Sequence, residues 1–492
     1  MTTKLLLLPV ILPFIAGCCI ALLPFRSGKI RNIFTFSAVL LNSVLSVFVI
    51  LNRGGTLRLV QLTEKISVSL RCDGLSVVFL ALIAFLWPLA TLYSFEYMEK
   101  EENRPRFFGF YTMCFGITCG IALSANLLTM YLFYELLTLA TIPLIAHEGD
   151  LRSQRAARKY IIYSLSGASL SFVGIMILLT YGSHGGFVFG GIRYVSSLSP
   201  EKIGRLLVGY MFTFLGFGVK SALVPFHAWL PTAGVAPTPV TALLHAVAVV
   251  KSGVFAVIRC TYYAFGPELL SGTWVQTTAL VLSAITILFG SVMALREQHF
   301  KRRLAYSTVS NLSYILFGAA CMTVGGLEAA LSHMLFHAIM KITLFFCAGT
   351  VLCKTGREYT PDLEGLGRKM PLTFSVFLLA SLALTGAPLL PGFISKMNLL
   401  KEAAKLSGGN GAVLFGMIAL LLSALLTAAY LLPLSIRSFV PHSGAEPVFT
   451  GKDKDPGWRM LLPFAVLCAS MIVFGCASSG LMTWLHALIT EG

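Results

Sequence analysis

A small set of titratable side chains lies inside long apolar stretches of this sequence, where no water solvates a charge. A charged group at the centre of a bilayer costs about 2.5–3.5 kcal/mol on insertion scales. Such groups are retained for a purpose, and several of them together are typical of a proton relay. The set contains four lysines, one glutamate and four histidines: Lys220, Lys251, Lys341, Lys396, Glu135, His227, His245, His333 and His337.

Two simpler explanations account for part of this set. A lysine near the end of a span can extend its ammonium to the membrane surface, and Lys341 is the best candidate for this. A purely structural ion pair with Glu135 would account for one lysine. Neither explains four lysines, so the set favours a chain of proton-exchanging groups. We expect Glu135 to pair with Lys220 and hold it protonated, which would make this pair a switch.

The histidines differ in what their spacing predicts. His333, His337 and Lys341 follow each other at intervals of four residues, which places them on one slowly drifting stripe of a helix. This stripe favours a relay. His245 and Lys251 are six residues apart and lie on different faces, so His245 could equally bridge two helices. His227 follows a proline and could instead fix the local loop.

The composition indicates which elements must position these groups. The 492 residues are 56% hydrophobic and 12% charged, with a mean hydropathy of +0.82, which is typical of an all-α polytopic membrane protein. Fourteen apolar segments are long enough to predict spans: 4–24, 32–52, 75–95, 107–124, 126–145, 159–181, 203–223, 238–263, 273–294, 304–324, 328–350, 371–390, 411–434 and 460–482.

Motifs for redox or nucleotide chemistry are absent from the sequence. The 11 cysteines form no Cys-x-x-Cys pair, and no Gly-rich phosphate loop follows a strand pattern. We therefore expect no cofactor and no metal in this chain, and any redox reaction would take place on another subunit. The net charge of +16 does not indicate nucleic acid, because most lysines and arginines fall in the loops of one side. That side is predicted to be cytoplasmic, with both termini outside.

Two short stretches suggest an internal repeat. The sequences GFGVK (216–220) and GFISK (392–396) share Gly-Phe-x-x-Lys beside prolines, at Pro225 in the first case and Pro388 and Pro391 in the second. They occupy span 7 and span 12, the fourth members of spans 4–8 and 9–13. Two blocks of five spans begin on opposite sides of the membrane, which predicts inverted repeats whose broken helices mark an ion site. The predicted division is 1–106 (three spans with a hairpin-like loop near 53–74), 107–263, 264–434 and 435–492 (a polar linker and a last helix).

Four longer blocks resemble the antiporter-like membrane subunits of respiratory complex I, Mrp-type sodium/proton antiporters and membrane-bound hydrogenases. They are KSALVPFHAWLPTAGVAPTPVTALLHAVAVVKSGVFAVIR (220–259), FKRRLAYSTVSNLSYILFG (300–318), LSHMLFHAIMKITLFF (331–346) and LTGAPLLPGFISKMNLL (384–400). The resemblance implies a fourteen-helix fold with two inverted five-helix half-channels and broken helices 7 and 12. It also implies roles for the fifth-helix Glu135, its partner Lys220, the central Lys251 and the outward-facing Lys396.

The resemblance further implies a setting. The partners would be other membrane subunits of one complex, including related antiporter-like subunits, in the lipid bilayer of a prokaryotic plasma membrane. The ion would be the proton, and sodium antiport stays open. Lys396, where complex I often has glutamate, and the lack of a long C-terminal extension are similar to the D-type member of the Mrp antiporters. Thr232 and His299 depart from the family, which often has acidic residues at these positions.

Two other functions fit a membrane protein of this size. One is a stand-alone secondary transporter for an ion or solute, and the other is a scaffold subunit that pumps nothing. A carrier needs one site near the midplane rather than a row of charges along the membrane, and a scaffold has no need of buried charges. Both are therefore less favoured than a proton-translocating subunit.

Overall fold

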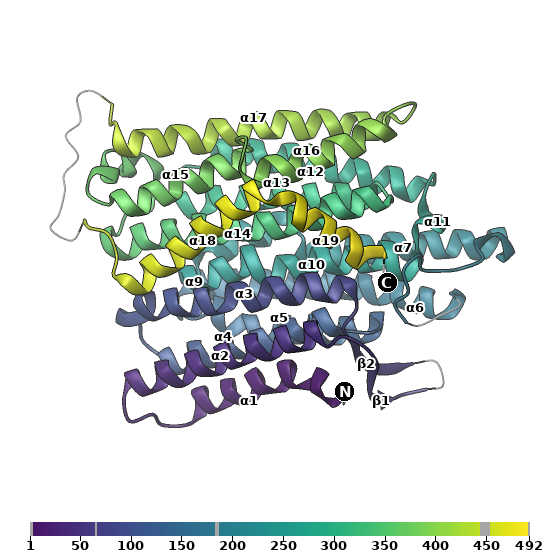
Figure 1. Ribbon diagram of the computed structural model, residues 1–492, viewed down its shortest axis with the longest axis horizontal. Coiled ribbons are helices and arrows are strands. Elements are labelled where there is room, and N and C mark those ends of the chain that lie inside the picture. The colour runs from purple at the N-terminus through teal and green to yellow at the C-terminus, as the bar shows by residue number, and fades with distance from the viewer. Residues whose placement is uncertain (1–2, 64–65, 183–185, 443–452, 491–492) are drawn as a thin grey trace.

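The computed structural model describes residues 3–63, 66–182, 186–442 and 453–490, and these residues form a bundle of nearly parallel helices with one small hairpin (Figure 1). The N-terminal part contains a 3₁₀ turn, the first three long helices and the hairpin. These elements are η1 (Thr3–Leu7), α1 (Leu8–Leu22), α2 (Gly28–Leu51), β1 (Thr56–Gln61), β2 (Ser67–Arg71), α3 (Gly74–Tyr97) and η2 (Met98–Lys100). The two strands pair antiparallel, as the polar, β-branched stretch near 53–74 predicts.

The next part of the chain runs through the centre of the bundle. Its long helices are α4 (Arg104–Leu123), α5 (Leu127–Ile145), α6 (Leu151–Tyr181) and α7 (Pro200–Lys220). Shorter pieces follow: η3 (Val195–Ser197) before α7, and then η4 (Phe226–Ala228), α8 (Trp229–Thr232), η5 (Ala233–Val235), α9 (Thr238–Ala242), η6 (Leu243–Val247), α10 (Val249–Arg259), η7 (Cys260–Phe265) and α11 (Pro267–Leu270).

The remainder repeats the pattern of long helices with one interruption. The elements are α12 (Trp274–Arg296), α13 (Phe300–Ala320), α14 (Val324–Thr355), η8 (Thr360–Leu363), η9 (Leu366–Arg368), α15 (Pro371–Thr385), α16 (Pro391–Leu406), α17 (Gly411–Phe439), α18 (Trp458–Cys476) and α19 (Ser478–Thr490). Most of the predicted polar linker, residues 443–452, lies outside the described residues. The first and last described helical turns lie at the same end of the bundle as the hairpin (Figure 1).

The number of spans is lower than the fourteen predicted. Among the described residues, twelve helices are long and apolar enough to cross a membrane, or thirteen if the bent pair Thr360–Arg368 and Pro371–Thr385 counts as one span. All fourteen predicted segments contain a helix. The difference arises because α13 begins with three basic residues and carries many hydroxyl side chains, and because α15 has only 15 residues. A helix of that length rises about 23 Å, less than the hydrocarbon core.

Both predicted helix breaks are present. Helix α7 ends at Lys220, and a turn and the short helices around Pro225 and Pro231 follow it. Helix α15 ends at Thr385, where Gly386 has a φ of +101° that favours glycine, and α16 begins at Pro391. The break follows the lysine in the first case and precedes Lys396 in the second.

A third irregularity was not predicted. The buried segment Thr238–Phe265 contains two stretches of π-helix, η6 and η7, on either side of α10. In η6 the amide of Ala248 donates to the carbonyl of Leu243, five residues earlier, at 2.9 Å. π-Bulges are rare and occur frequently at functional sites. The piece of regular helix between them carries Lys251.

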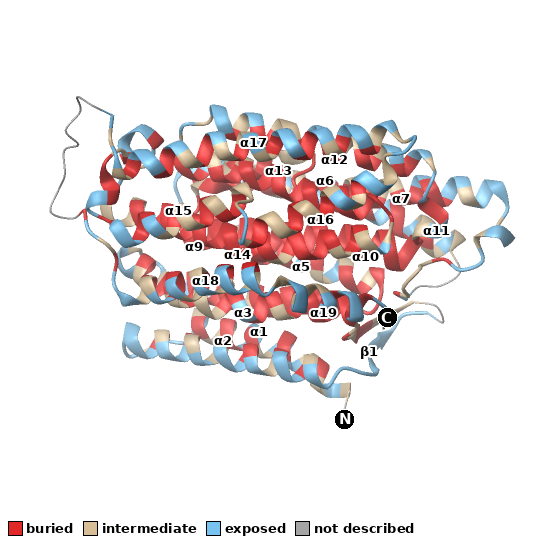
Figure 2. Cartoon of the chain, turned by 45° about the horizontal axis from the view of Figure 1, so that its top comes forward, coloured by how far each residue is buried: buried red, intermediate tan, exposed pale blue. Residues whose placement is uncertain are grey.

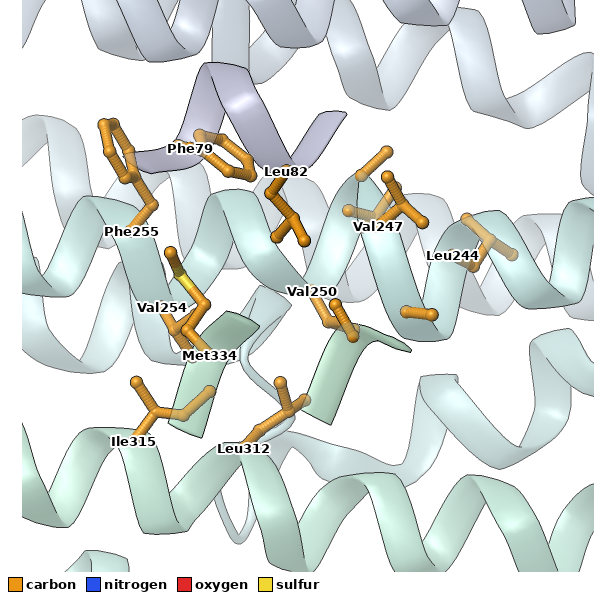
Figure 3. Close-up of a cluster of buried hydrophobic side chains, with 14 of the residues drawn as sticks. Phe79, Leu82, Leu244, Val247, Val250, Val254, Phe255, Leu312, Ile315 and Met334 are labelled. Carbon is orange, nitrogen blue, oxygen red and sulfur yellow. The ribbon is translucent and has the colours of Figure 1, made fainter. Parts of the chain in front are cut away.

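The core of the bundle surrounds α10 and α14, and the outer helices present their apolar side chains outward (Figure 2). Figure 3 shows side chains of α10 packed between α3 on one side and α13 and α14 on the other. Phe255 of α10 stacks on Phe79 of α3 with ring centroids 4.7 Å apart, and Val254 lies beside Met334 of α14. This apolar packing encloses the polar groups described next.

Candidate functional site

The ion pair expected between α5 and α7 is present. Lys220 Nζ lies 3.7 Å from Glu135 Oε1, with the lysine side chain 1% and the glutamate side chain 21% exposed. Lys220 also donates to the backbone carbonyl of Tyr134 at 2.5 Å, and its ammonium sits 3.4 Å from the centroid of the Tyr134 ring. The lysine charge is therefore stabilised by a carboxylate, a carbonyl and an aromatic face.

Helix α10 approaches the end of α7 very closely. A side chain at Gly253 would clash, because its Cβ would lie 2.7 Å from the amide nitrogen of Ser221. This contact brings the backbone next to Lys220 against the helix that carries Lys251. The buried hydroxyl of Ser252, beside Gly253, has no hydrogen-bond partner among the described residues.

At the centre of the bundle, Lys251 of α10 contacts a histidine of α14. Lys251 Nζ lies 2.6 Å from His337 Nδ1, and both residues are fully buried. Lysine and imidazole can each bind or give up a proton, whereas a carboxylate partner would favour one fixed charge state. The two groups therefore form a contact through which a single proton can be shared.

The row of candidate proton-exchanging groups, which runs from Glu135 and Lys220 to Lys251 and His337, continues along α14 to the second helix break. The ring of His333 lies 5.8 Å from the ring of His337 and stacks on Tyr314 of α13 at 5.2 Å. His333 Nδ1 lies 2.9 Å from the hydroxyl of Ser395 in α16. The residue after that serine is Lys396, whose ammonium lies 5.5 Å from the centroid of the Tyr314 ring.

Lys396 is held by the end of a helix. Its Nζ donates to the carbonyls of Leu384 at 2.6 Å and Thr385 at 3.1 Å. These are the last residues of α15, whose terminal carbonyls have no partner within the helix and carry its negative dipole end. The break before α16 thus supplies the groups that solvate the lysine.

The predicted stripe on α14 is present, but its members turn to different neighbours. His333 faces α16 and His337 faces α10, whereas Lys341 donates to the carbonyl of Leu304 in α13 at 3.0 Å. Lys341 is fully buried, which excludes the alternative that its ammonium reaches the membrane surface. The divergence follows from the drift of residues at i, i+4 and i+8 around a helix.

The two secondary histidines are less closely connected. His245 is fully buried in η6 against the ring of Phe345, and neither ring nitrogen has a hydrogen-bond partner among the described residues. A helix-bridging hydrogen bond, one of its two expected roles, is therefore not observed. His227 is half-buried against Phe289. The loop that His227 could alternatively fix is held by a hydrogen bond from the Trp229 indole to the Val219 carbonyl.

Several nitrogen and oxygen atoms along the row lack hydrogen-bond partners in the described part of the chain. They include Glu135 Oε1, both ring nitrogens of His245, and Nε2 of His333 and of His337. Buried polar atoms of this kind are commonly paired with ordered water. No group of three or more His, Cys, Asp or Glu side chains in the described residues could hold a metal ion.

Besides Arg31 near the start of α2, two buried basic residues were not among the charges predicted to lie inside apolar segments. Arg259 is fully buried and makes a bidentate pair with Asp73, with both N–O distances 2.6 Å. Lys301 is 6% exposed and donates to the carbonyl of Ala236 at 3.2 Å. Asp73 stands directly before the apolar run of α3 and caps that helix by accepting a hydrogen bond from the Ser76 amide. This aspartate was the available signal in the sequence for a buried partner such as Arg259.

The two departures from the family pattern have partners. The hydroxyl of Thr232 accepts a hydrogen bond from Lys159 Nζ at 3.1 Å. His299 Nε2 lies 3.5 Å from Glu358 Oε2 in the adjoining loop. Burial lowers the pKa of His299, and the charge of Glu358 opposes this effect. Nearby, burial raises the pKa of Glu148, against the opposing charge of Lys301.

Residues 124–423 match the family described as NADH:quinone oxidoreductase/Mrp antiporter, TM. The chain belongs to this family. Residues 61–108 also match the family described as NADH-Ubiquinone oxidoreductase (complex I), chain 5 N-terminus. The Staphylococcus aureus (strain MSSA476) protein mnhA2, which carries the name of an antiporter subunit, is 31% identical over 436 residues. The alignment covers 82% of this chain and 52% of mnhA2, so the chain spans about half the length of the curated relatives it matches.

Solved structures of three complexes contain chains with this fold. A chain of the archaeal membrane-bound sulfane sulfur reductase superposes with a TM-score of 0.86 at 22% identity, covering 99% of this chain and 98% of that one. A chain of the Mrp complex from Dietzia sp. DQ12-45-1b gives 0.83 at 23% identity, covering 98% and 51%. A chain of Thermus thermophilus respiratory complex I gives 0.81 at 24% identity, covering 99% and 98%. The family is thus that of the expected resemblance, but the relatives named mnhA2 do not single out the D-type member of the Mrp antiporters.

Proposed function

We propose that this chain is a proton-translocating, antiporter-like subunit of a multi-subunit membrane complex. The observation that carries the proposal is the contact between Lys251 Nζ and His337 Nδ1 at 2.6 Å. This contact joins the central helix α10 to α14. In the proposal it links Lys220 and Lys396, the two lysines beside helix breaks, through groups that exchange protons. Family membership supports the same class of function.

In the proposed path, protons enter from the cytoplasmic side toward Lys220 and Lys251. They pass His337 and His333, with Lys341 alongside, and leave by Lys396. Water paired with the unpartnered ring nitrogens would bridge the gaps between neighbouring groups. His245 and His227 are secondary members of this path. The two five-helix blocks would act as its inward and outward halves.

Glu135 is proposed to couple this subunit to its neighbour. Its side chain lies between the buried Lys220 and an outward face of α5 that exposes Leu132, Leu136 and Leu139. A neighbouring subunit bound to this apolar face would be close enough to alter the charge balance at Glu135. Proton release from Lys220 would then follow a change outside the chain.

The position within the family is a further part of the proposal. Lys396 supports a D-type Mrp protein or a hydrogenase relative, whereas the similarity to mnhA2 supports an A-type one. Sodium antiport and a redox module both remain compatible with the row of residues. The genes adjacent to this one would distinguish these settings, because each type of complex has a different set of subunits.

The proposal is tested by proton uptake into inverted membrane vesicles that contain the intact complex. Lys251→Met and His337→Gln should each lower the rate by about a hundredfold, the scale for loss of a positioned proton-transfer group. Lys202→Met, at an exposed position, is the matched control and should transport normally. Unchanged transport by both core variants would contradict the proposal. Purification of a monomer that transports by itself would favour the stand-alone carrier.

A further inference from the structure

A large cavity lies away from the proton-exchanging row, at the end of the bundle opposite the hairpin. Its volume is about 1260 Å³, and the starts of α2, α4 and α18 and the turn η2 after α3 form its walls. Figure 1 shows α2 and α18 beginning at the end opposite the N and C labels. Because four helix ends meet here, the cavity lies at the level where a span leaves the bilayer.

Arg31 is a buried charge in the wall of this cavity without a carboxylate partner among the described residues. It is 7% exposed, and its Nε atom has no hydrogen-bond partner in the part of the chain that the structure describes. Its NH2 group donates to Asn32 Oδ1 at 3.0 Å, and the guanidinium lies 5.5 Å from the centroid of the Phe108 ring. A buried guanidinium that retains a free N–H is suited to bind an anion.

The surrounding charges favour an anionic ligand. Four more basic residues line the cavity, Lys29, Lys100, Arg104 and Arg459, and no ion pair is observed for any of them in the described residues. Three glutamates at 99, 101 and 102 also line it, which leaves the lining net positive. In addition, α4 begins without a side-chain cap, which leaves the amide of Arg104 available, although Pro105 has no N–H. The start of α18 is already occupied, because the Gly457 amide donates to Glu96 Oε1 at 2.7 Å.

Part of the lining is apolar and faces outward. Ile33 is 67% and Trp458 65% exposed, and Phe36 and Leu462 lie in the same wall. Tryptophan is enriched at the membrane–water boundary, where its ring spans the apolar and polar layers. A ligand of this cavity therefore has to combine a negative group with a hydrocarbon portion.

We propose that the cavity binds an anionic phospholipid of the bilayer. The phosphate accepts hydrogen bonds from Arg31 and Arg104 and faces the first turn of α4. The acyl chains lie against Ile33, Phe36 and Leu462. Basic pockets between helices on the cytoplasmic side bind such headgroups in other membrane proteins. The bound lipid would hold α18 against α2 and α4, which are far apart in the sequence.

The test uses the intact complex, purified in mild detergent and depleted of lipid. Its affinity for phosphatidylglycerol, for phosphatidylcholine and for inorganic phosphate is measured by the shift in melting temperature as each is added. Phosphatidylglycerol should stabilise the complex, whereas phosphatidylcholine and inorganic phosphate should not. Arg31→Gln and Arg104→Gln should each weaken the affinity for phosphatidylglycerol about tenfold, or ~1.4 kcal/mol.

Arg152→Gln provides the matched control, because this exposed arginine lies outside the cavity. Should Arg31→Gln fail to assemble, the Arg104→Gln variant carries the test by itself. Equal affinities for the two lipids, an equal effect of inorganic phosphate, or unchanged affinity in the arginine variants would overturn the proposal. The absence of phosphatidylglycerol binding in the intact complex would overturn it as well.

Discussion

The ion pair between Glu135 and Lys220 provides the sharpest test of coupling. We predict that Glu135→Gln abolishes most proton transport while the complex still assembles. The substitution keeps the size of the side chain and removes only its charge. Lys220 would retain its hydrogen bond to the Tyr134 carbonyl and its contact with the Tyr134 ring, so the change isolates the carboxylate.

The size of the effect follows from the distance. Two unit charges 3.7 Å apart attract by about 4 kcal/mol at an effective dielectric constant of about 20. The ring contact that remains is worth about 2 kcal/mol at a desolvated site. Because about 1.4 kcal/mol corresponds to a factor of ten, loss of the carboxylate weakens the hold of Lys220 on its proton by a factor on the order of a thousand. Lys220 would then remain without its proton, and the pair could no longer act as a switch.

The assay compares four versions of the complex in inverted vesicles, with a pH-sensitive dye as the readout. They are the native complex, Glu135→Gln, Lys220→Gln and the double variant. Because the two residues act as one unit, the double variant should be no worse than either single variant. Glu201→Gln is the matched control, since that glutamate is 73% exposed and pairs with Arg205 on the surface. Subunit composition on a native gel verifies assembly.

Two outcomes would refute the reasoning. Normal transport by Glu135→Gln would mean that the pair does not control the proton on Lys220. Strictly multiplicative losses in the double variant would mean that the two residues act independently despite their 3.7 Å separation. A complex that fails to assemble would point to a structural ion pair, which is the simpler alternative.

Two further predictions concern stability. Arg259→Met removes the bidentate partner of the buried Asp73 carboxylate and leaves the more exposed Arg71, 3.3 Å away, as its remaining cation. It should cost up to about 3 kcal/mol, seen as a lower melting temperature, whereas the same change at the exposed Arg205 should cost less than about 1 kcal/mol; equal shifts would contradict this. Burial lowers the pKa of His299 below the unfolded value of about 6.5, so the stability that neutral His299 contributes is present above that pH and lost as the pH falls. Between about pH 7 and 5.5, the melting temperature of His299→Gln should therefore fall less than that of the native protein, and parallel curves would exclude the effect.

Much of the site could be predicted because charge in an apolar segment is easily recognised. The four lysines and Glu135 stand out against sequence with no other reason to carry charge, and all four lysines are buried. The breaks near Pro225 and Pro391 could also be predicted, since proline and glycine act on the local backbone alone. The family resemblance is confirmed by the match over residues 124–423.

Contacts between distant segments could not be predicted in the same way. The spacing of His333, His337 and Lys341 defines a stripe, but it does not reveal that His337 would meet Lys251, 86 residues away. Arg259 stands near the end of the predicted span 238–263 and was not counted among the charges inside apolar segments. Its partner Asp73 caps the start of α3, 186 residues earlier, and the position of the aspartate alone does not reveal which cation it meets.

The partners of the lysines suggest why the chain places them beside backbone carbonyls rather than carboxylates. Lys341 and Lys396 donate to carbonyls of α13 and α15, and a carbonyl accepts a hydrogen bond from either the ammonium or the neutral amine. It therefore solvates both protonation states, whereas a buried carboxylate would strongly favour the charged one. Of Lys220, Lys251, Lys341 and Lys396, only Lys220 has a carboxylate within 4 Å in the described residues. A row that relays protons needs groups that gain and lose a proton easily. A step that is controlled from outside needs a group whose proton is retained until the control acts. Lys220 beside Glu135 is such a group, which is the arrangement expected if Glu135 is the point of control.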